Sequence, residues 1–95
     1  MSLEFEWDES KAELNLKKHG INFESASSVF NDPLAFIFDD KWHSFDELRE
    51  IIIGHDLIYR ILLVCFTERN NRIRIISARL ATKTERQDYE QQSGF

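Results

Sequence analysis

The chain has 95 residues, of which 42% are apolar, 13% aromatic and 31% charged, with a formal net charge of −5. This length predicts one domain over residues 1–95 with a single core. No apolar run approaches the roughly 18 residues of a membrane helix, and the acidic N-terminus is unlike a signal peptide, so we expect a cytoplasmic protein without membrane contacts. The single Cys65 excludes an internal disulfide and is expected to pack in the core.

The charges are unevenly distributed along the chain. Residues 1–50 carry 12 acidic and five basic side chains, whereas residues 51–95 carry five acidic and seven basic ones. Between positions 69 and 86, Glu85 is the one acid among six cations, which are Arg69, Arg72, Arg74, Arg79, Lys83 and Arg86. Such a segment is either an anion-binding site on an acidic body or a solvated charged face, and the pattern alone leaves both open.

The first third of the chain shows the signals of a strand and two helices. Phe5 and Trp7 alternate with acidic residues, which predicts a short strand with one buried face. Asp8 as an N-cap and Gly20 as a left-handed terminator predict a helix between them. A second short helix is expected over residues 23–30, ended by the Asp32-Pro33 pair.

After Pro33 the apolar residues follow a strand period. Strands are expected over residues 34–38, 48–54, 59–67 and 72–79, joined by short connectors into an antiparallel meander. Thr82 and Glu85 form a capping box that opens a last helix through Tyr89, which has almost no apolar face and should be loosely held or completed by a partner. The fold class is α+β: two N-terminal helices packed on a four- to five-stranded, mainly antiparallel sheet with a short C-terminal helix.

The register of the last hairpin decides where its cations lie. A four-residue turn over 68–71 places Thr67 opposite Arg72. Ser77 and Arg79, together with Arg60, then share the core face, while Arg72 and Arg74 project from the open face. A bulge near Ser77 would instead bring the two groups of residues together.

The sequence contains no metal-ligand spacing, no glycine-rich phosphate loop and no serine nucleophile motif, so no metal or other cofactor is expected. The polar side chains that remain as candidates for chemistry are those of Arg and Lys residues and a few scattered His residues. Guanidinium groups pair bidentately with phosphate oxygens and stabilise charge that develops on them. This composition suits either phosphate chemistry or an interface with an acidic partner.

Several short motifs resemble the BrnT family of toxins in their order and spacing, over about residues 5–90. They are Trp7-Asp8, Lys11, Asn15, Lys18-His19-Gly20, Phe23, Val29-Phe30, Asp32-Pro33, His43-Ser44, Glu47, Arg49, Ile53-Gly54, the run from Arg72 to Arg79, Glu85 and Tyr89. The resemblance implies a RelE-like fold, metal-independent RNA cleavage that inhibits translation, and a bacterial type II toxin–antitoxin operon. It also implies neutralisation by a BrnA-type antitoxin that holds a pair of toxins. The alternative is a non-catalytic protein-binding module of the same fold.

RNA cleavage without a metal needs an acid, a base and cations around the phosphate. We nominate Arg74, Arg79, His19 and Tyr89 as catalytic residues, Tyr89 because RelE-like toxins often use a C-terminal tyrosine. The RNA-binding candidates are Arg72, Lys83, Arg49 and Arg86. Five of these residues have structural alternatives. His19 suits a helix end, Tyr89 a packing anchor, Arg74 a solvated edge residue, Arg79 a hydrogen-bond cluster that anchors the last helix, and Arg49 an ion pair with an acid such as Asp8 or Glu47.

Overall fold

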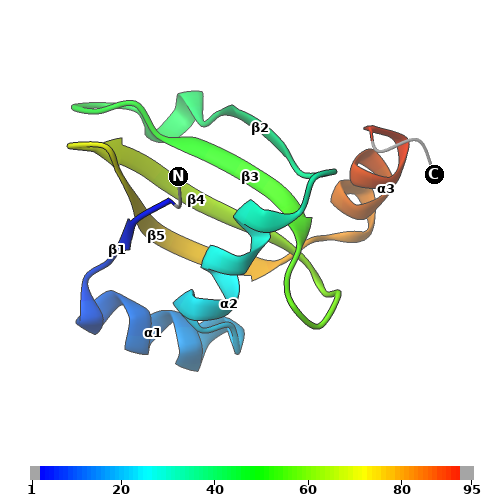
Figure 1. Cartoon of the computed structure of the whole chain (residues 1–95), viewed down its shortest axis with the longest axis horizontal. Helices are drawn as coiled ribbons and strands as arrows, with labels where there is room; N and C mark the ends of the chain where they lie inside the picture. The colour runs from blue at the N-terminus through cyan, green and yellow to red at the C-terminus, as the bar shows by residue number, and fades with distance from the viewer. Residues whose placement is uncertain (1–2, 93–95) are drawn as a thin grey trace.

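A five-stranded sheet with strand order β1-β5-β4-β3-β2 forms the centre of the computed structural model, which describes residues 3–92 (Figure 1). The elements in chain order are β1 (Phe5–Glu6), α1 (Glu9–His19), α2 (Phe23–Ser28), a 3-10 turn η1 (Val29–Asn31), β2 (Phe36–Asp39), a second 3-10 turn η2 (Lys41–His43), β3 (Glu50–His55), β4 (Ile61–Arg69), β5 (Arg72–Leu80) and α3 (Lys83–Gln92). The α+β class is therefore as expected. No helix within residues 3–92 is long and apolar enough to cross a membrane.

The N-terminal helices begin where their caps predict. The Asp8 side chain accepts a hydrogen bond from the Lys11 N–H at 3.1 Å, and Gly20 ends α1 with a φ of 71°. Asn22 caps α2 in the same way through the Ser25 N–H at 2.8 Å. The second helix is shorter than the expected 23–30, because its last turn tightens into the 3-10 geometry of η1 before Pro33.

The sheet is mixed: the sequence predicted a mainly antiparallel sheet but not which strand pairs in parallel. Strands β2 to β5 do form that meander, but β1 pairs in parallel with β5, with Phe5 opposite Ile73. Helices α1 and α2 lie between β1 and the meander in the chain and cross one face of the sheet (Figure 1). This long crossover lets β1 run parallel to its neighbour.

The main core lies between these two helices and one face of the sheet. Phe23, Ala26 and Val29 pack against strand residues such as Val64 and Ile75, all of them nearly inaccessible to solvent. Gly54 lies in β3 beside this core, at a position that has no room for a side chain. A Cβ at position 54 would lie 2.7 Å from the Ala35 Cβ, which is closer than real contacts allow.

The hairpin between β4 and β5 has a different register from the expected one. Its turn is only Asn70 and Asn71, with φ of 51° and 65°, so Arg69 pairs with Arg72 and Thr67 with Arg74. Both central residues of a type I′ turn need positive φ, which asparagine tolerates. The expected pairing of Thr67 with Arg72 was wrong.

A β-bulge then shifts the register between Cys65 and Phe66. Phe66 pairs with Ile75, but Cys65 pairs with Ser77, so Ile76 is the extra residue. Beyond it the alternation inverts: Ala78 lies on the core face, and Ser77 and Arg79 move to the open face. Their expected place on the core face was wrong. Arg60 is not on that face either, because it precedes β4 and pairs with the buried Asp56 at 2.8 Å.

Candidate active site

The open face of the sheet carries a hollow of about 390 Å³. Strands β2 to β5, the segment between β2 and β3, and the first turn of α3 all contribute to it. Its lining residues are Phe38, Asp40, His43, Arg49, Ile51, Leu63, Cys65, Ile76, Ser77, Arg79 and Glu85. The bulge in β5 is what brings Ser77 and Arg79 into this hollow.

Asp40 and His43 form a hydrogen-bonded pair at the rim. The His43 Nδ1 lies 2.9 Å from the Asp40 Oδ2, and the Asp40 side chain is largely buried while the His43 ring is exposed. Ser44 fixes the segment around them, since its hydroxyl donates to the Asp40 carbonyl at 2.6 Å and accepts from the Arg49 N–H at 3.0 Å. A carboxylate that binds one ring nitrogen orients the imidazole and leaves Nε2 available for proton transfer.

Arg49 supplies a positive charge to the hollow beside this pair. Within residues 3–92, no carboxylate lies within 4 Å of its guanidinium, whereas the other arginines of the sheet, Arg69, Arg72, Arg74 and Arg79, all have acidic partners. The Arg49 side chain also lines a second hollow of about 360 Å³ together with His43 and Phe45. Neither structural ion pair suggested for Arg49, with Asp8 or with Glu47, is formed.

Arg79 is held by Glu85. Its two terminal nitrogens donate to the two carboxylate oxygens of Glu85 at 2.8 and 3.0 Å, and Glu85 also accepts from the Thr82 N–H. The bidentate hydrogen bonds hold the pKa of Glu85 below its ordinary value and raise that of Arg79. Arg79 thus joins β5 to the start of α3, and the capping box is formed as the sequence predicted.

Burial and a nearby carboxylate keep Cys65 in the thiol form. Its pKa is raised to about 11, first by burial and then by the negative charge of Asp40, to which the thiol donates at 3.8 Å. The packed-residue interpretation of Cys65 fits this environment. Among residues 3–92, no group of three His, Cys, Asp or Glu side chains is arranged to hold a metal ion.

The remaining predicted cations lie outside the hollow. Arg74 is bound by Glu6 of β1 at 3.0 Å and Arg72 by Glu4, just before β1, at 3.2 Å. Lys83 and Arg86 are exposed on α3. The structure therefore brings together only Arg49 and Arg79 of the six predicted cations.

His19 lies in a separate groove along α1. Lys11, Lys17 and Lys18 line that groove with it, and Ile76 and Ser77 close its far side. Because these two bulge residues also line the main hollow, the basic groove and the hollow meet at the β5 edge.

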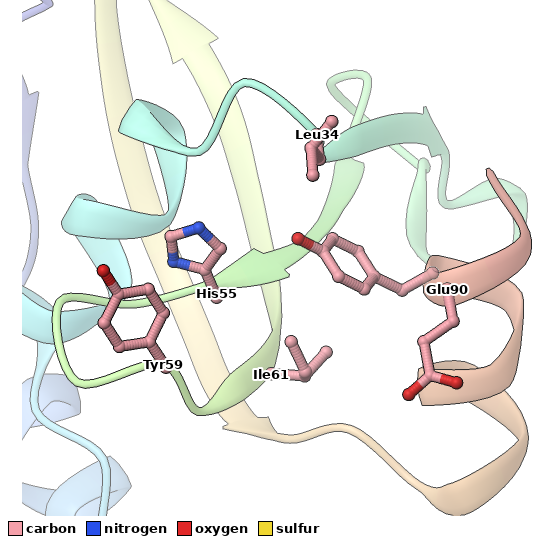
Figure 2. A pocket seen from close by; sticks show the side chains of 6 residues that line it. Leu34, His55, Tyr59, Ile61 and Glu90 are labelled. Atoms are coloured by element: carbon pink, nitrogen blue, oxygen red, sulfur yellow. The ribbon is translucent and has the colours of Figure 1, made fainter. Parts of the chain in front are cut away.

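Tyr89 is buried and lines an apolar pocket. The other residues that line this pocket are Leu34, His55, Tyr59, Ile61 and Glu90 (Figure 2). The Tyr89 hydroxyl donates to the Asp32 Oδ2 at 2.7 Å, and its ring packs with Ile53 and Leu63. Burial, followed by the bond to Asp32, raises the pKa of Tyr89 well above its usual value. This environment favours the packing-anchor interpretation over proton transfer near neutral pH.

Sequence reasoning did not nominate Asp40 or His43 as site residues. The signal was present as an Asp-x-x-His spacing in a segment expected to be a polar loop. Without the η2 turn, which brings the carboxylate and imidazole into contact, that spacing has no special meaning.

Comparisons with known proteins agree with this architecture. Residues 7–85 match the model of the family described as the BrnT ribonuclease toxin of type II toxin–antitoxin systems. The 1.1 Å crystal structure of the Brucella abortus ribonuclease toxin BrnT superimposes with a TM-score of 0.67 and 26% sequence identity, covering 86% of this chain and 100% of that one. No curated protein matches the sequence. Because the family match covers most of its length, the chain belongs to the BrnT ribonuclease toxin family of type II toxin–antitoxin systems.

Proposed function

We propose that the protein is an endoribonuclease toxin that cleaves RNA without a metal ion and thereby inhibits translation. The observation that carries this proposal is the Asp40–His43 pair beside Arg49, which no carboxylate of residues 3–92 neutralises. Transesterification of RNA requires a base, a cation at the phosphate and a proton for the leaving oxygen. In this proposal the carboxylate-oriented His43 is the base and Arg49 is the cation.

Each group has a role in the proposed reaction. Arg49 binds the scissile phosphate and stabilises the charge that grows on its oxygens. His43 takes the proton of the 2′-hydroxyl through Nε2, Asp40 holds the ring, and the 2′-oxygen attacks phosphorus as the bond to the 5′-oxygen breaks. The departing 5′-oxygen takes a proton from solvent. Solvent reaches this place because the His43 ring is exposed.

The residues nominated from sequence take supporting places in this proposal. Arg79 shapes the hollow through Glu85, and Tyr89 fixes α3. The groove with His19 and three lysines meets the hollow at Ser77 and offers a path for the RNA strand. Arg72, Arg74, Lys83 and Arg86 lie around the same sheet and helix and would contact phosphates farther along the strand.

Cleavage assays in EDTA test the assignment directly. Purified toxin free of antitoxin should cleave RNA, and His43→Gln should lower the rate by about 10²- to 10⁴-fold, the usual size of an acid–base contribution. Arg49→Gln should lower it by about 10²-fold. Matched changes at His19 and Arg86 should have much smaller effects, with circular dichroism confirming that every variant folds. Full activity of His43→Gln with loss in His19→Gln would move the active site to the α1 groove.

The proposed partner is a BrnA-type antitoxin that holds a pair of toxins in a cytoplasmic complex. The family's type II description is the support for a protein antitoxin. Co-expression with a BrnA-type antitoxin should yield a complex that no longer cleaves RNA. Intact RNA with the free toxin, combined with tight antitoxin binding, would favour a non-catalytic binding module.

A further inference from the structure

Two aromatic side chains beside His43 are almost fully exposed. Trp42 and Phe45 each retain 86% of their accessible surface, and neither belongs to the hydrophobic clusters of the fold. Large aromatic rings normally contribute by being buried. The folding of this domain therefore gives no account of why two of them lie in one short segment.

The segment that carries these rings is ordered by its own hydrogen bonds. The Asp40 N–H donates to the Arg49 carbonyl at 2.8 Å, and the Ser44 hydroxyl accepts from the Arg49 N–H at 3.0 Å. Trp42 lies inside the η2 turn, next to His43. The rings are thus presented from a fixed turn, and a ligand that packs on them has little backbone to order.

The surroundings of the rings contain one guanidinium that no carboxylate of residues 3–92 binds. Phe45 lines the second hollow together with His43, Arg49, Arg69, Asp46 and Glu47. Glu47 is paired with Arg69 at 2.9 Å, whereas Arg49 has no such partner among the described residues. Phe38, at 41% exposure, lines the main hollow and stacks on Phe36 with ring centroids 5.9 Å apart. A purely apolar protein segment placed here would desolvate Arg49 without a counter-charge, which is costly. A nucleotide supplies a base for the rings and a phosphate for the guanidinium.

We propose that Trp42 and Phe45 form a stacking platform for the bases that flank the scissile phosphate, so that the substrate is single-stranded RNA with unstacked bases. This inference rests on the proposed ribonuclease function. Bases inside a duplex cannot reach such a platform because they are already stacked and paired.

The test uses Trp42 as its own reporter. The chain has two tryptophans, so a Trp7→Phe background leaves Trp42 as the sole indole. Single-stranded oligonucleotides with 2′-O-methyl groups resist cleavage, and an abasic strand of equal length carries the same phosphates. Quenching of Trp42 fluorescence by the base-bearing strand, but not by the abasic strand, is the expected result. In the native background, Trp42→Ala and Phe45→Ala should each weaken binding of the base-bearing strand by roughly 5- to 150-fold.

Leu57→Ala is the control, since Leu57 is 78% exposed in the connection between β3 and β4, away from both hollows, and should bind like the parent. Equal affinities of the alanine variants and the parent, with RNA cleavage retained, would overturn the platform and leave the ribonuclease function standing. Quenching without any cleavage would support the platform and reject the catalytic role. Loss of antitoxin binding with unchanged oligonucleotide affinity would assign the two rings to the antitoxin interface and overturn the proposal.

Discussion

The carboxylate of Asp32 is buried yet carries a charge at neutral pH. Burial alone would raise its pKa, but the His55 N–H, the Leu34 N–H and the Tyr89 hydroxyl all donate to it, and the His55 ring lies 3.3 Å away. These contacts outweigh the burial and lower the pKa of Asp32. One residue thereby ties the start of β2, the end of β3 and helix α3 together.

Removing the Tyr89 hydroxyl tests this network. Tyr89→Phe should lower the free energy of unfolding by about 1–2 kcal/mol, because a buried hydrogen bond to a charged group is lost. Urea denaturation measures this, and Tyr59→Phe is the matched control, since Tyr59 is 78% exposed. RNA cleavage by folded Tyr89→Phe should persist. A variant with native stability and no cleavage would restore Tyr89 as a catalytic residue.

Among the elements, β5 shows where sequence reasoning succeeds and where it fails. Alternation and caps placed the helices and strands, since those signals are local. The bulge at Ile76 leaves no such local signal in the sequence. Two residues beyond it, buried Asn15 on α1 exchanges hydrogen bonds with the Ala78 N–H and carbonyl at 3.1 and 2.8 Å. The part of β5 next to Arg79 is thus held by a residue far away in the sequence.

Helix α3 is attached to the sheet mainly at Tyr89 and at its capped first turn. Glu85→Ala removes both the cap and the Arg79 pair, at a cost of about 1 kcal/mol for the cap. Amide exchange over residues 84–91 should then quicken by at least about fivefold, while β4 stays protected. Asp88→Ala, an exposed change on the same helix, should leave exchange unaltered. If the amides of α3 stayed as protected as those of β4 in both variants, the helix would not depend on its first turn.

Across the whole molecule, the two faces of the sheet differ: one is covered by helices and the other carries the hollow. Helices α1 and α2 cover one face with the main core, while α3 lies at one end of the sheet (Figure 1). Helix α3 packs through Tyr89 on the other face, which also carries the hollow. The helices-on-sheet arrangement was predictable from apolar periodicity. The contact of His43 with Asp40 was not predictable, and neither was the lack of an acidic partner for Arg49 among the described residues. Both depend on side-chain directions within the segment between β2 and β3.

The balance of carboxyl groups sets the response of the whole fold to acid. The pKa values of Asp32, Glu47 and Glu85 are lowered, so the unfolded chain takes up protons before the folded one. Their contribution to stability is present above the ordinary carboxyl pKa and is lost as pH falls through the lowered values. The pKa of Glu50 is shifted in the opposite direction. Its pKa is raised by burial and by the charges of Glu68 and Asp39, so its ionised form destabilises the fold at neutral pH.

The free energy of unfolding, measured by urea denaturation between pH 7 and pH 3, should therefore be constant near neutral pH and decline below about pH 4.5. Glu50→Gln should raise its value near neutral pH by about 0.5 kcal/mol, because Glu50 and Asp39 are like charges paired directly across β3 and β2. The gain should shrink as pH falls through the raised pKa of Glu50 and should be largely gone by its ordinary value of about 4.5, because the parent Glu50 is then itself protonated. Glu13→Gln, an exposed change on α1, removes the same formal charge without a paired acid. An equal gain from Glu13→Gln would mean that the net charge of −5, rather than the local pair, opposes folding.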